Sequence, residues 1–402
     1  MSYRDYDRNY RRPAGVSRYT GNRRRVNRRL RNRIIIIASA LVALALVIVL
    51  ITSAFSCVCS SGAKGSKIDT ATKSTKPKTE SVKKATVKKE ISFREPSIEY
   101  DESTGTGTAV SDNLYVWNQM AFELFNVKPS QAKSYAEVIN SAQKSLGRKN
   151  KVHSMIVPNQ TEMALPGQVK SQAGLKTVSQ ADYIKKVYDT LSSDISFINC
   201  YNHLSKYNSE YIYFDSDPNW TGLGAYYGYK AFASATKQKA VKLTSLNEDM
   251  IEGFNGSYSS MTEETLNTDS VHFWDFPYSV KSEITRESGE TETVDGCFNK
   301  YAEGSDSYSV FLNGDNPLEV IKSGYSKAKN GKIAVVHDSL GNAFIPYLTY
   351  NYKEIYSVDY RTYKSNLKKL CRDNGITEVL FINGAVNSAD ASQQKAIKSI
   401  IG

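Results

Sequence analysis

Hydrophobic and polar positions repeat with the periods of helices and strands from residue 130 onward. Residues 130–146 carry apolar side chains at helical spacing and stop at Gly147, which predicts a helix. A second helix is predicted to begin at Ser179, where Asp182 completes a start that resembles a capping box. Between them, residues 151–158 form an apolar run that predicts a buried strand. The same reasoning predicts strands at 195–200, 210–214, 332–337, 354–358 and 378–383, and helices at 221–233 and 363–374.

This alternation of strands and helices predicts the fold class. It indicates an α/β domain with a mostly parallel sheet and helices on both faces. Residues 237–326 contain turn residues, short alternating runs and little helical period, so a β-rich insertion or loop-rich cap is expected there. In open parallel sheets the chemistry gathers at the carboxyl ends of the strands.

Residues 34–55 form a different pattern, an apolar run of twenty-two residues without a charge. About twenty such residues cross a bilayer as a helix, so this segment predicts a single transmembrane helix. Residues 1–33 carry twelve Arg against Asp5 and Asp7, and the basic side of an anchor stays in the cytoplasm. The prediction is a cell-membrane protein with its N-terminus inside and its C-terminal domain outside. A cleaved signal peptide, or a lipoprotein signal ending at Cys57, are the alternatives.

The net positive charge of the chain comes from its N-terminal segments and not from the predicted folded domain. Taking the +10 of residues 1–33 and the +6 of residues 60–96 from the total of +11 leaves −5 for the remainder. The basic tail is explained by membrane orientation and anionic lipid, and no nucleic-acid partner is expected. Residues 56–107 are rich in Lys, Thr and Ser, which predicts a disordered stalk. The folded domain is then expected to occupy residues 108–402.

The five cysteines point to no disulfide framework and no metal site, because their spacing fits neither. Cys200 is placed at the end of an apolar strand and Cys371 on an apolar helix stripe, so both are expected in the core. No group of His, Asp and Glu has metal-binding spacing either. The sequence therefore predicts no metal and no cofactor.

The segment 335–342 is the first candidate for chemistry. A strand ends at His337, Ser339 follows in a tight turn, and Gly341 lets the backbone reverse. This arrangement would expose the Ser339 hydroxyl at a helix N-terminus, where backbone N–H groups bind an oxyanion. The alternative is an ordinary helix cap, in which Asp338 or Ser339 accepts hydrogen bonds from free amides.

A second segment, 213–227, carries a resemblance to a known family. It reads Y-F-D-S-D-P-N-W-T-G-L-G-A-Y-Y and precedes H-D-S-L-G-N-A-F at 337–344. Together with S-M-I-V-P-N-Q-T at 154–161, G-F-N-G-S-Y at 253–258 and the stretch 358–383, this order resembles the DHHW family of bacterial cell-surface proteins. That family is related to the SGNH-hydrolase-like proteins of alginate acetylation.

The resemblance implies an SGNH-like fold with a serine nucleophile and a D-x-H pair. Ser339 matches the nucleophile and Asp217 the carboxylate that orients the base, whereas Asn219 falls where the base histidine belongs. Pro218 takes the place of the other histidine of the motif. Gly341 and Asn342 are expected substrate-binding residues, and Trp220 is a candidate for the same role, although core packing is favoured for it. An Asn amide cannot accept the serine proton as imidazole does.

Two functions remain open at this point. The first is a degenerate domain that binds a cell-surface glycan or a protein partner in its former catalytic cleft. The second is an active esterase or O-acyltransferase on a cell-surface polysaccharide, with Ser339 activated by another group. His337 is one candidate for that group, although residues two apart on a strand lie about 6–7 Å apart. The remaining three histidines, His153, His203 and His272, are expected to be structural.

Overall fold

The computed structural model describes residues 91–402. The basic tail, the predicted transmembrane segment 34–55 and the first part of the predicted stalk lie outside the described residues. Within residues 91–402, no helix is long and apolar enough to cross a membrane.

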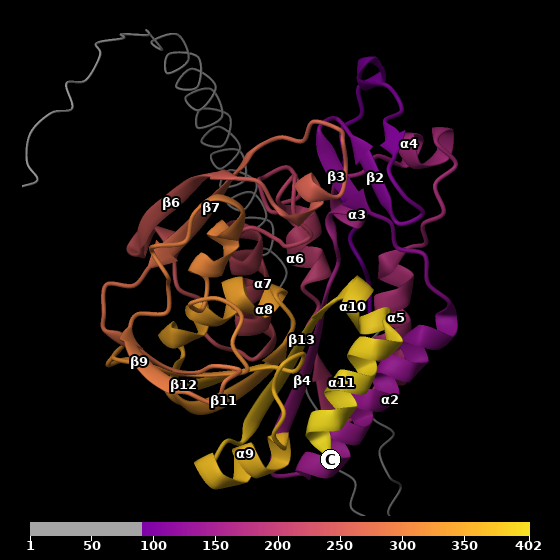
Figure 1. The fold of residues 1–402 in the computed structure, drawn as a ribbon. Helices are drawn as coiled ribbons and strands as arrows, with labels where there is room; N and C mark the ends of the chain where they lie inside the picture. Colours follow the sequence, from indigo (N-terminus) through magenta and orange to yellow (C-terminus); the bar gives the residue numbers. More distant parts are fainter. Residues whose placement is uncertain (1–90) are drawn as a thin grey trace, which may run out of the picture. The chain divides into compact units, whose positions relative to one another are not determined.

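An eight-stranded sheet forms the centre of this part of the chain (Figure 1). Its order is β5 (Ile195–Phe197), β4 (Lys151–Val157), β13 (Glu378–Gly384), β11 (Asn330–His337), β12 (Tyr352–Asp359), β10 (Leu318–Ser323), β8 (Val280–Thr285) and β9 (Thr291–Asp295). The first five strands are parallel, and the last three are antiparallel to their neighbours. The central parallel strands are apolar nearly throughout because helices cover both of their faces.

Helices lie on the two faces of the parallel part, as Figure 1 shows. On one face α2 (Pro129–Leu146) packs against α5 (Gln180–Thr190) and α11 (Ala391–Ile401). On the other face α7 (Gly222–Ala235) packs against α8 (Leu340–Phe344). The remaining helices are α3 (Gln160–Met163), α4 (Gly167–Gln172), α6 (Tyr201–Lys206), α9 (Leu367–Asn374) and α10 (Ala385–Ala389). Short 3₁₀ turns span Glu102–Thr104, Leu243–Ser245, Ser257–Ser260, Gly304–Val310 and Ile345–Tyr350.

Two small sheets complete the fold. One joins β1 (Thr108–Ala109), β2 (Leu114–Trp117) and β3 (Met120–Glu123), and the other joins β6 (Asn247–Phe254) and β7 (Asp269–Asp275). The strands expected between residues 237 and 326 are confirmed. The prediction that they form an insertion separate from the main sheet is wrong for β8, β9 and β10. These three extend the main sheet beyond β12 as antiparallel strands, in the order β10, β8 and β9.

Several boundaries differ from those predicted. Residues 210–214 form no strand, only an isolated bridge between Tyr213 and Trp220, because the chain turns directly into the D-P-N-W segment. The predicted strand at 195–200 ends at Phe197, and Cys200 instead precedes α6. Cys200, Cys297 and Cys371 are buried free thiols, as expected of core residues.

The expected stalk is also shorter than predicted. The Phe93 ring packs edge-on against Tyr201, with ring centroids 5.0 Å apart. The backbone N–H of Arg94 donates to the side-chain oxygen of Asn202 at 2.8 Å. The folded part therefore begins by residue 91 rather than at residue 108. Isolated aromatic residues such as Phe93 are too sparse to change the composition of the segment.

Candidate functional site

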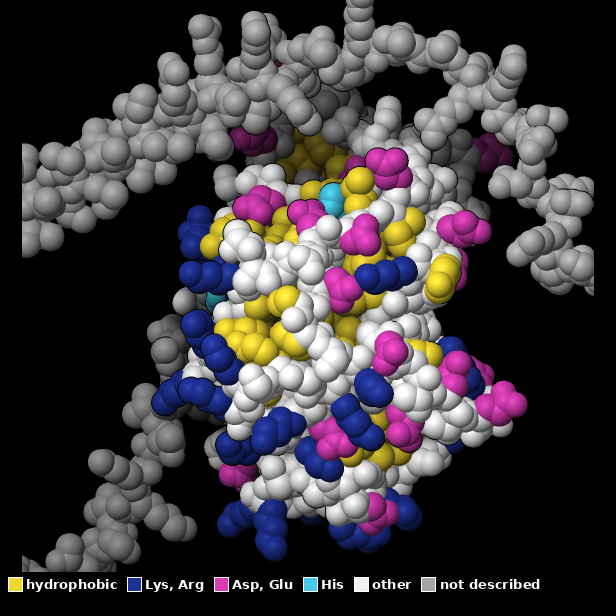
Figure 2. Space-filling model, turned by 90° about the vertical axis from the view of Figure 1, so that its left-hand side faces the viewer, with side chains coloured by type: hydrophobic (Ala, Val, Ile, Leu, Met, Phe, Trp, Pro, Cys, Tyr) yellow, Lys and Arg dark blue, Asp and Glu magenta, His cyan; other side chains and the backbone are white. Residues whose placement is uncertain are grey.

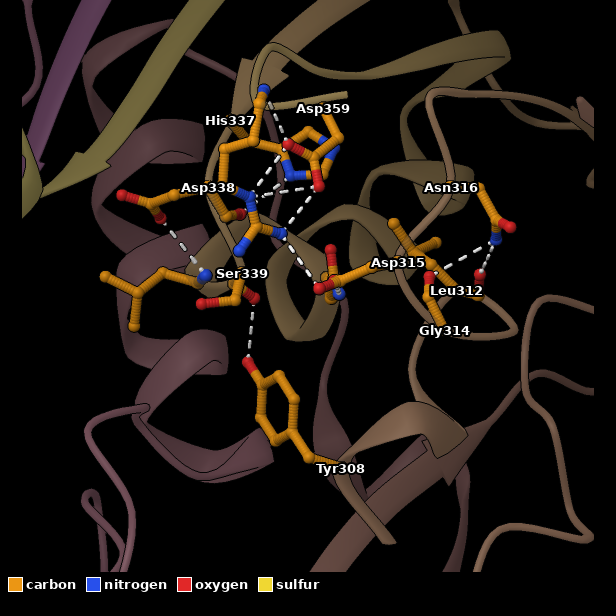
Figure 3. Close-up of polar contacts among 12 residues, drawn as sticks. Tyr308, Leu312, Gly314, Asp315, Asn316, His337, Asp338, Ser339 and Asp359 are labelled. Atoms are coloured by element: carbon orange, nitrogen blue, oxygen red, sulfur yellow. Dashed lines mark hydrogen bonds and ion pairs between the residues drawn. The ribbon is translucent and has the colours of Figure 1, made fainter. Parts of the chain in front are cut away.

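Ser339 lies where the parallel strand β11 ends and α8 begins. The carboxylate of Asp338 holds this turn, because it accepts hydrogen bonds from the backbone N–H of Leu340 at 3.1 Å and of Gly384 at 2.9 Å. The side-chain amide of Asn387 donates to the same carboxylate at 2.8 Å. The cap predicted here is therefore supplied by Asp338, and the Ser339 hydroxyl makes no capping bond (Figure 3). Ser339 is free to serve the cleft beside it.

The Ser339 hydroxyl begins a chain of hydrogen bonds through Asn219 to Asp217. It donates to the Asn219 Oδ1 atom at 2.9 Å, and the Asn219 Nδ2 atom donates to the Asp217 carboxylate at 2.8 Å. The backbone N–H of Asn219 donates to the same carboxylate oxygen at 3.0 Å. Asn219 thus accepts from the serine and donates to the aspartate, the polarity that a neutral histidine would have in a serine–histidine–aspartate triad. The structure brings together the three residues that the sequence singled out.

The segment G-F-N-G-S-Y supplies the other contacts of Asp217. The backbone N–H and the hydroxyl of Ser257 donate to the second Asp217 oxygen at 3.1 and 3.2 Å. Burial raises the pKa of Asp217, and the hydrogen bonds from Ser257 and Asn219 oppose that rise. A Cβ on Gly256 would lie 2.4 Å from the Asp217 Cβ, so only glycine allows this close approach.

Asp269 on β7 fixes the loop that carries Asp217. Its carboxylate accepts the backbone N–H groups of Asp215 and Ser216, both at 2.9 Å. The Tyr211 and Ser216 hydroxyls also donate to this carboxylate. Sequence reasoning did not find Asp269, because it lies more than fifty positions from the loop and no local motif marks it.

The expected substrate-binding residues have different positions. Trp220 is 0% exposed and its indole N–H donates to the Leu340 carbonyl at 2.9 Å, so it packs in the core, the role favoured for it, and does not line the cleft. Gly341 is buried beneath His337, and a Cβ there would lie 2.3 Å from the imidazole ring. Its role is close packing rather than ligand contact. Asn342 does line the cleft, where its amide donates to the Asp315 carboxylate at 2.7 Å.

His337 is not available to Ser339. Its Nδ1 atom lies 2.8 Å from the Asp338 carbonyl, which can only accept, so Nδ1 carries a proton. Its Nε2 atom lies 2.6 Å from the Ser357 hydroxyl. Burial lowers the pKa of His337, the nearby Asp359 charge opposes that shift, and both ring nitrogens are engaged away from the cleft. His337, the candidate that its spacing from Ser339 already disfavoured, is therefore not placed to act as a substitute base.

The other three histidines lie outside the Ser339 cleft. His153 Nε2 pairs with the Glu378 carboxylate at 2.9 Å, and His272 Nδ1 pairs with that of Glu248 at 2.9 Å. His203 lies on α6 rather than before an edge strand, and burial lowers its pKa. Among residues 91–402, no three His, Cys, Asp or Glu side chains form a group that could hold a metal ion.

A cleft of about 770 Å³ opens beside Ser339, Asn219 and Asp217. Arg361 lines it and bridges two carboxylates, with its Nη2 atom 3.0 Å from Asp315 and 2.5 Å from Asp359. Burial lowers the pKa of Arg361, but the carboxylates of Asp359 and Asp315 together raise it by more. The net pKa is raised, so the guanidinium stays charged. The Tyr308 hydroxyl donates to the Ser339 carbonyl at 3.0 Å (Figure 3). Tyr308 and Asp315 belong to segments that showed no motif.

A second cavity of about 250 Å³ lies against the same residues. Pro218, Asn219, Ser339 and Arg361 line both cavities. On this side they are joined by Glu123, the last residue of β3, whose pKa burial raises to about 7. Ser339 therefore lies between two hollows, one of about 770 Å³ and one of about 250 Å³ that also contains the Glu123 carboxyl.

The helix N-terminus after Ser339 offers fewer free amides than expected. The N–H groups of Leu340 and Gly341 donate to Asp338, and that of Asn342 donates to the Ser339 carbonyl. The α8 amides proposed for an oxyanion are already engaged within the turn, because a five-residue helix tightens its first turn with i to i+3 bonds.

Comparison with known families decides where the chain belongs. The model of the family described as DHHW protein matches residues 86–358. The chain belongs to the DHHW family. The match includes the D-P-N-W and H-D-S-L-G-N-A-F segments, so the Ser339, Asn219 and Asp217 cluster lies inside the DHHW region. No curated protein matches the chain.

Two solved structures share the fold of this DHHW protein. A DHHW family protein from Eubacterium siraeum superposes with a TM-score of 0.66 at 24% identity, over 73% of this chain and 96% of that one. Bacillus cereus PatB1, solved with a sulfonyl adduct, superposes with a TM-score of 0.57 at 16% identity, over 70% of this chain and 96% of that one. The O-acetyltransferase domain of Pseudomonas putida AlgJ is a more distant match, with a TM-score of 0.38 at 10% identity over 70% of this chain and 96% of that one, and it does not bear on the fold.

Proposed function

We propose that this DHHW protein binds a cell-envelope polysaccharide through an SGNH-like domain whose serine site no longer performs acyl chemistry. Family membership supports a role at the bacterial cell surface. The cleft beside Ser339 supports the binding of a sugar polymer, because hydroxyl, amide and guanidinium groups converge in it. These include Ser257, Ser309, Ser339, Asn342 and Arg361.

One observation carries the loss of chemistry. The Ser339 hydroxyl donates its hydrogen bond to the Asn219 amide oxygen, at 2.9 Å. An amide oxygen is not basic enough to take the proton, so the serine hydroxyl is not activated for attack on an ester. His337 cannot replace it, because both of its ring nitrogens are bonded elsewhere. The hydrogen-bonded chain keeps the order of a triad without its base.

The proposal places the domain outside the cell, held by residues 34–55. The apolar run and the twelve Arg residues before it support this orientation. Protease added to intact cells with permeable walls is expected to digest residues 91–402 and to spare the N-terminal tail. Protection of the C-terminal domain would overturn the orientation.

The binding proposal predicts retention of polysaccharide without turnover. The full-length protein is expected to retain envelope polysaccharide from the organism that makes it, and to release no acetate from it. Ser339→Trp fills the cleft and should weaken retention by roughly tenfold or more, measured by co-sedimentation. Ser399→Trp is the matched control, because Ser399 is exposed on α11 and should leave retention unchanged. Equal retention by both variants would contradict the cleft as the binding site.

Glu123 favours a second candidate function, an active esterase or O-acyltransferase on the same class of polymer. Its carboxyl lines the small cavity with Ser339, and burial raises its pKa to about 7. A carboxylate of that pKa is a workable general base near neutral pH. In this case turnover would rise as pH increases through about 7, when Glu123 loses its proton, and would vanish in both Ser339→Ala and Glu123→Gln. That result would replace the binding proposal.

A further inference from the structure

A second large hollow lies apart from the residues that line the Ser339 cleft. It has a volume of about 770 Å³ and lies where the chain passes from β7 to β8 and from β9 to the segment 296–301. We call it the outer groove and define it by Asp275, Tyr278, Arg286, Asp295, Tyr301 and Asn313. None of its lining residues lines the Ser339 cleft. Figure 2 shows the side of the molecule that carries β6 and β9, where hydrophobic side chains surface among charges of both signs.

Aromatic rings form the floor and rim of the outer groove. The Phe276 and Tyr278 rings pack with centroids 5.3 Å apart, and Tyr278 packs on Tyr325 at 4.8 Å. These contacts fix the floor. At the rim Tyr301 is 94% exposed, although its backbone N–H is held by the Asn299 side chain at 3.1 Å. A tyrosine presented in this way offers a flat apolar face and a polar tip to a ligand.

The charged residues that line the outer groove balance in sign, and both of its cations are paired with carboxylates. Lys300 bonds the Asp275 carboxylate at 2.6 Å, and Arg286 bonds Glu292 at 2.5 Å and Asn316 at 2.7 Å. Such a lining produces little net field, so it does not favour a polyanion. A neutral polymer with flat apolar faces and many hydroxyls fits both features, and sugar rings have that chemistry.

One loop forms a wall between the outer groove and the Ser339 cleft. Asn313 lines the groove, whereas Gly314 and Asp315, the next residues along the chain, line the cleft. Consecutive Cα atoms are about 3.8 Å apart, so only the thickness of this loop separates the two hollows. Figure 3 shows how the Asn316 amide is bonded to the Leu312 and Gly314 carbonyls, at 3.1 and 3.2 Å, which holds the loop in shape.

We propose that the outer groove is a second subsite for a neutral segment of the same polysaccharide that enters the Ser339 cleft. This inference rests on the proposed polysaccharide binding. A polymer that crosses residues 313–315 contacts Tyr301 on one side and Arg361 on the other. Two linked contacts raise overall affinity because the second forms within one complex.

The test uses the full-length protein and neutral saccharides of defined length. Hexasaccharides and disaccharides of glucose, N-acetylglucosamine, galactose and mannose are titrated by calorimetry into the wild type, Tyr301→Ala and Tyr301→Phe. At least one hexasaccharide is expected to bind more tightly than its disaccharide. Tyr301→Ala should weaken the affinity for that hexasaccharide roughly tenfold and leave the affinity for the disaccharide unchanged. Tyr301→Phe keeps the aromatic ring and should bind both saccharides like the wild type.

The outcomes separate this inference from the proposed function. Unchanged hexasaccharide affinity in Tyr301→Ala overturns the outer groove as a subsite and leaves the cleft proposal standing. Binding that survives Ser339→Trp but is lost in Tyr301→Ala supports the groove and overturns the cleft. No saturable binding by the wild type to any of these saccharides overturns the outer groove. Because Tyr301 is exposed, its variants should melt at the wild-type temperature, which excludes unfolding as the cause.

Discussion

Replacing Asn219 by His is expected to give the protein esterase activity that depends on Ser339. Asn219 already joins the Ser339 hydroxyl to the Asp217 carboxylate, at 2.9 and 2.8 Å. An imidazole at this position would accept the serine proton while Asp217 holds its other nitrogen. General base catalysis contributes about 10²–10⁴-fold, so acetyl-ester turnover should rise over the wild type by that order. The measurement is the initial rate of 4-nitrophenyl acetate hydrolysis.

Two controls make this result interpretable. Asn219→Gln keeps an amide of comparable size without a base and should remain inactive. Ser339→Ala added to Asn219→His should abolish any gain, because it removes the nucleophile. A gain that persists without Ser339 would show that the new histidine acts directly on the ester, and the assignment of the site would be wrong. No gain in a correctly folded Asn219→His would mean that more than the base has been lost.

Replacing Trp220 by Ala is expected to cost about 3–5 kcal/mol of folding free energy. The indole is 0% exposed and packs so closely on α7 that a Cβ on Gly228 would lie 2.6 Å from it. Its N–H also bonds the Leu340 carbonyl, directly after Ser339. Chemical denaturation measures the loss.

Trp220→Phe separates packing from hydrogen bonding. It keeps most of the apolar volume but leaves the buried Leu340 carbonyl without this donor, so a loss of roughly 1–3 kcal/mol is expected. Polysaccharide retention by Trp220→Phe should stay near that of the wild type. A variant as stable as the wild type that fails to retain the polymer would show that Trp220 contacts the ligand after all.

Most of the parallel half of the fold could be predicted because its signals are local. The stripe of α2 and the apolar runs of β4, β11 and β13 lie within single elements, and their observed bounds differ from the predictions by only a few residues. The N-cap predicted at Ser179 is also confirmed, since its side chain accepts the Asp182 N–H at 3.1 Å. The helix α11 was not predicted, because its first turns are polar and only Ile397, Ile400 and Ile401 mark its apolar face.

The site was predictable only where a motif marks it. Ser339, Asn219 and Asp217 stand in segments that resemble a known pattern, and the structure brings them together. Asp315, Tyr308 and Asp269 reach the site from distant loops, where a single polar residue looks like any other surface position. The burial of Trp220 and Gly341 depends on α8 packing against α7, a contact that no short segment encodes.

The place of β13 in the sheet also sets when the chain can fold. β13 lies between β4 and β11, yet β4 is made early in the domain and β13 almost at its end. During synthesis β4 lacks this partner until every other strand of the main sheet has been made. Pairings between distant segments form slowly and leave strand edges open in the meantime. The centre of the sheet therefore closes only after its last strand has been made, and a chain that is cut short before β13 has an open edge there.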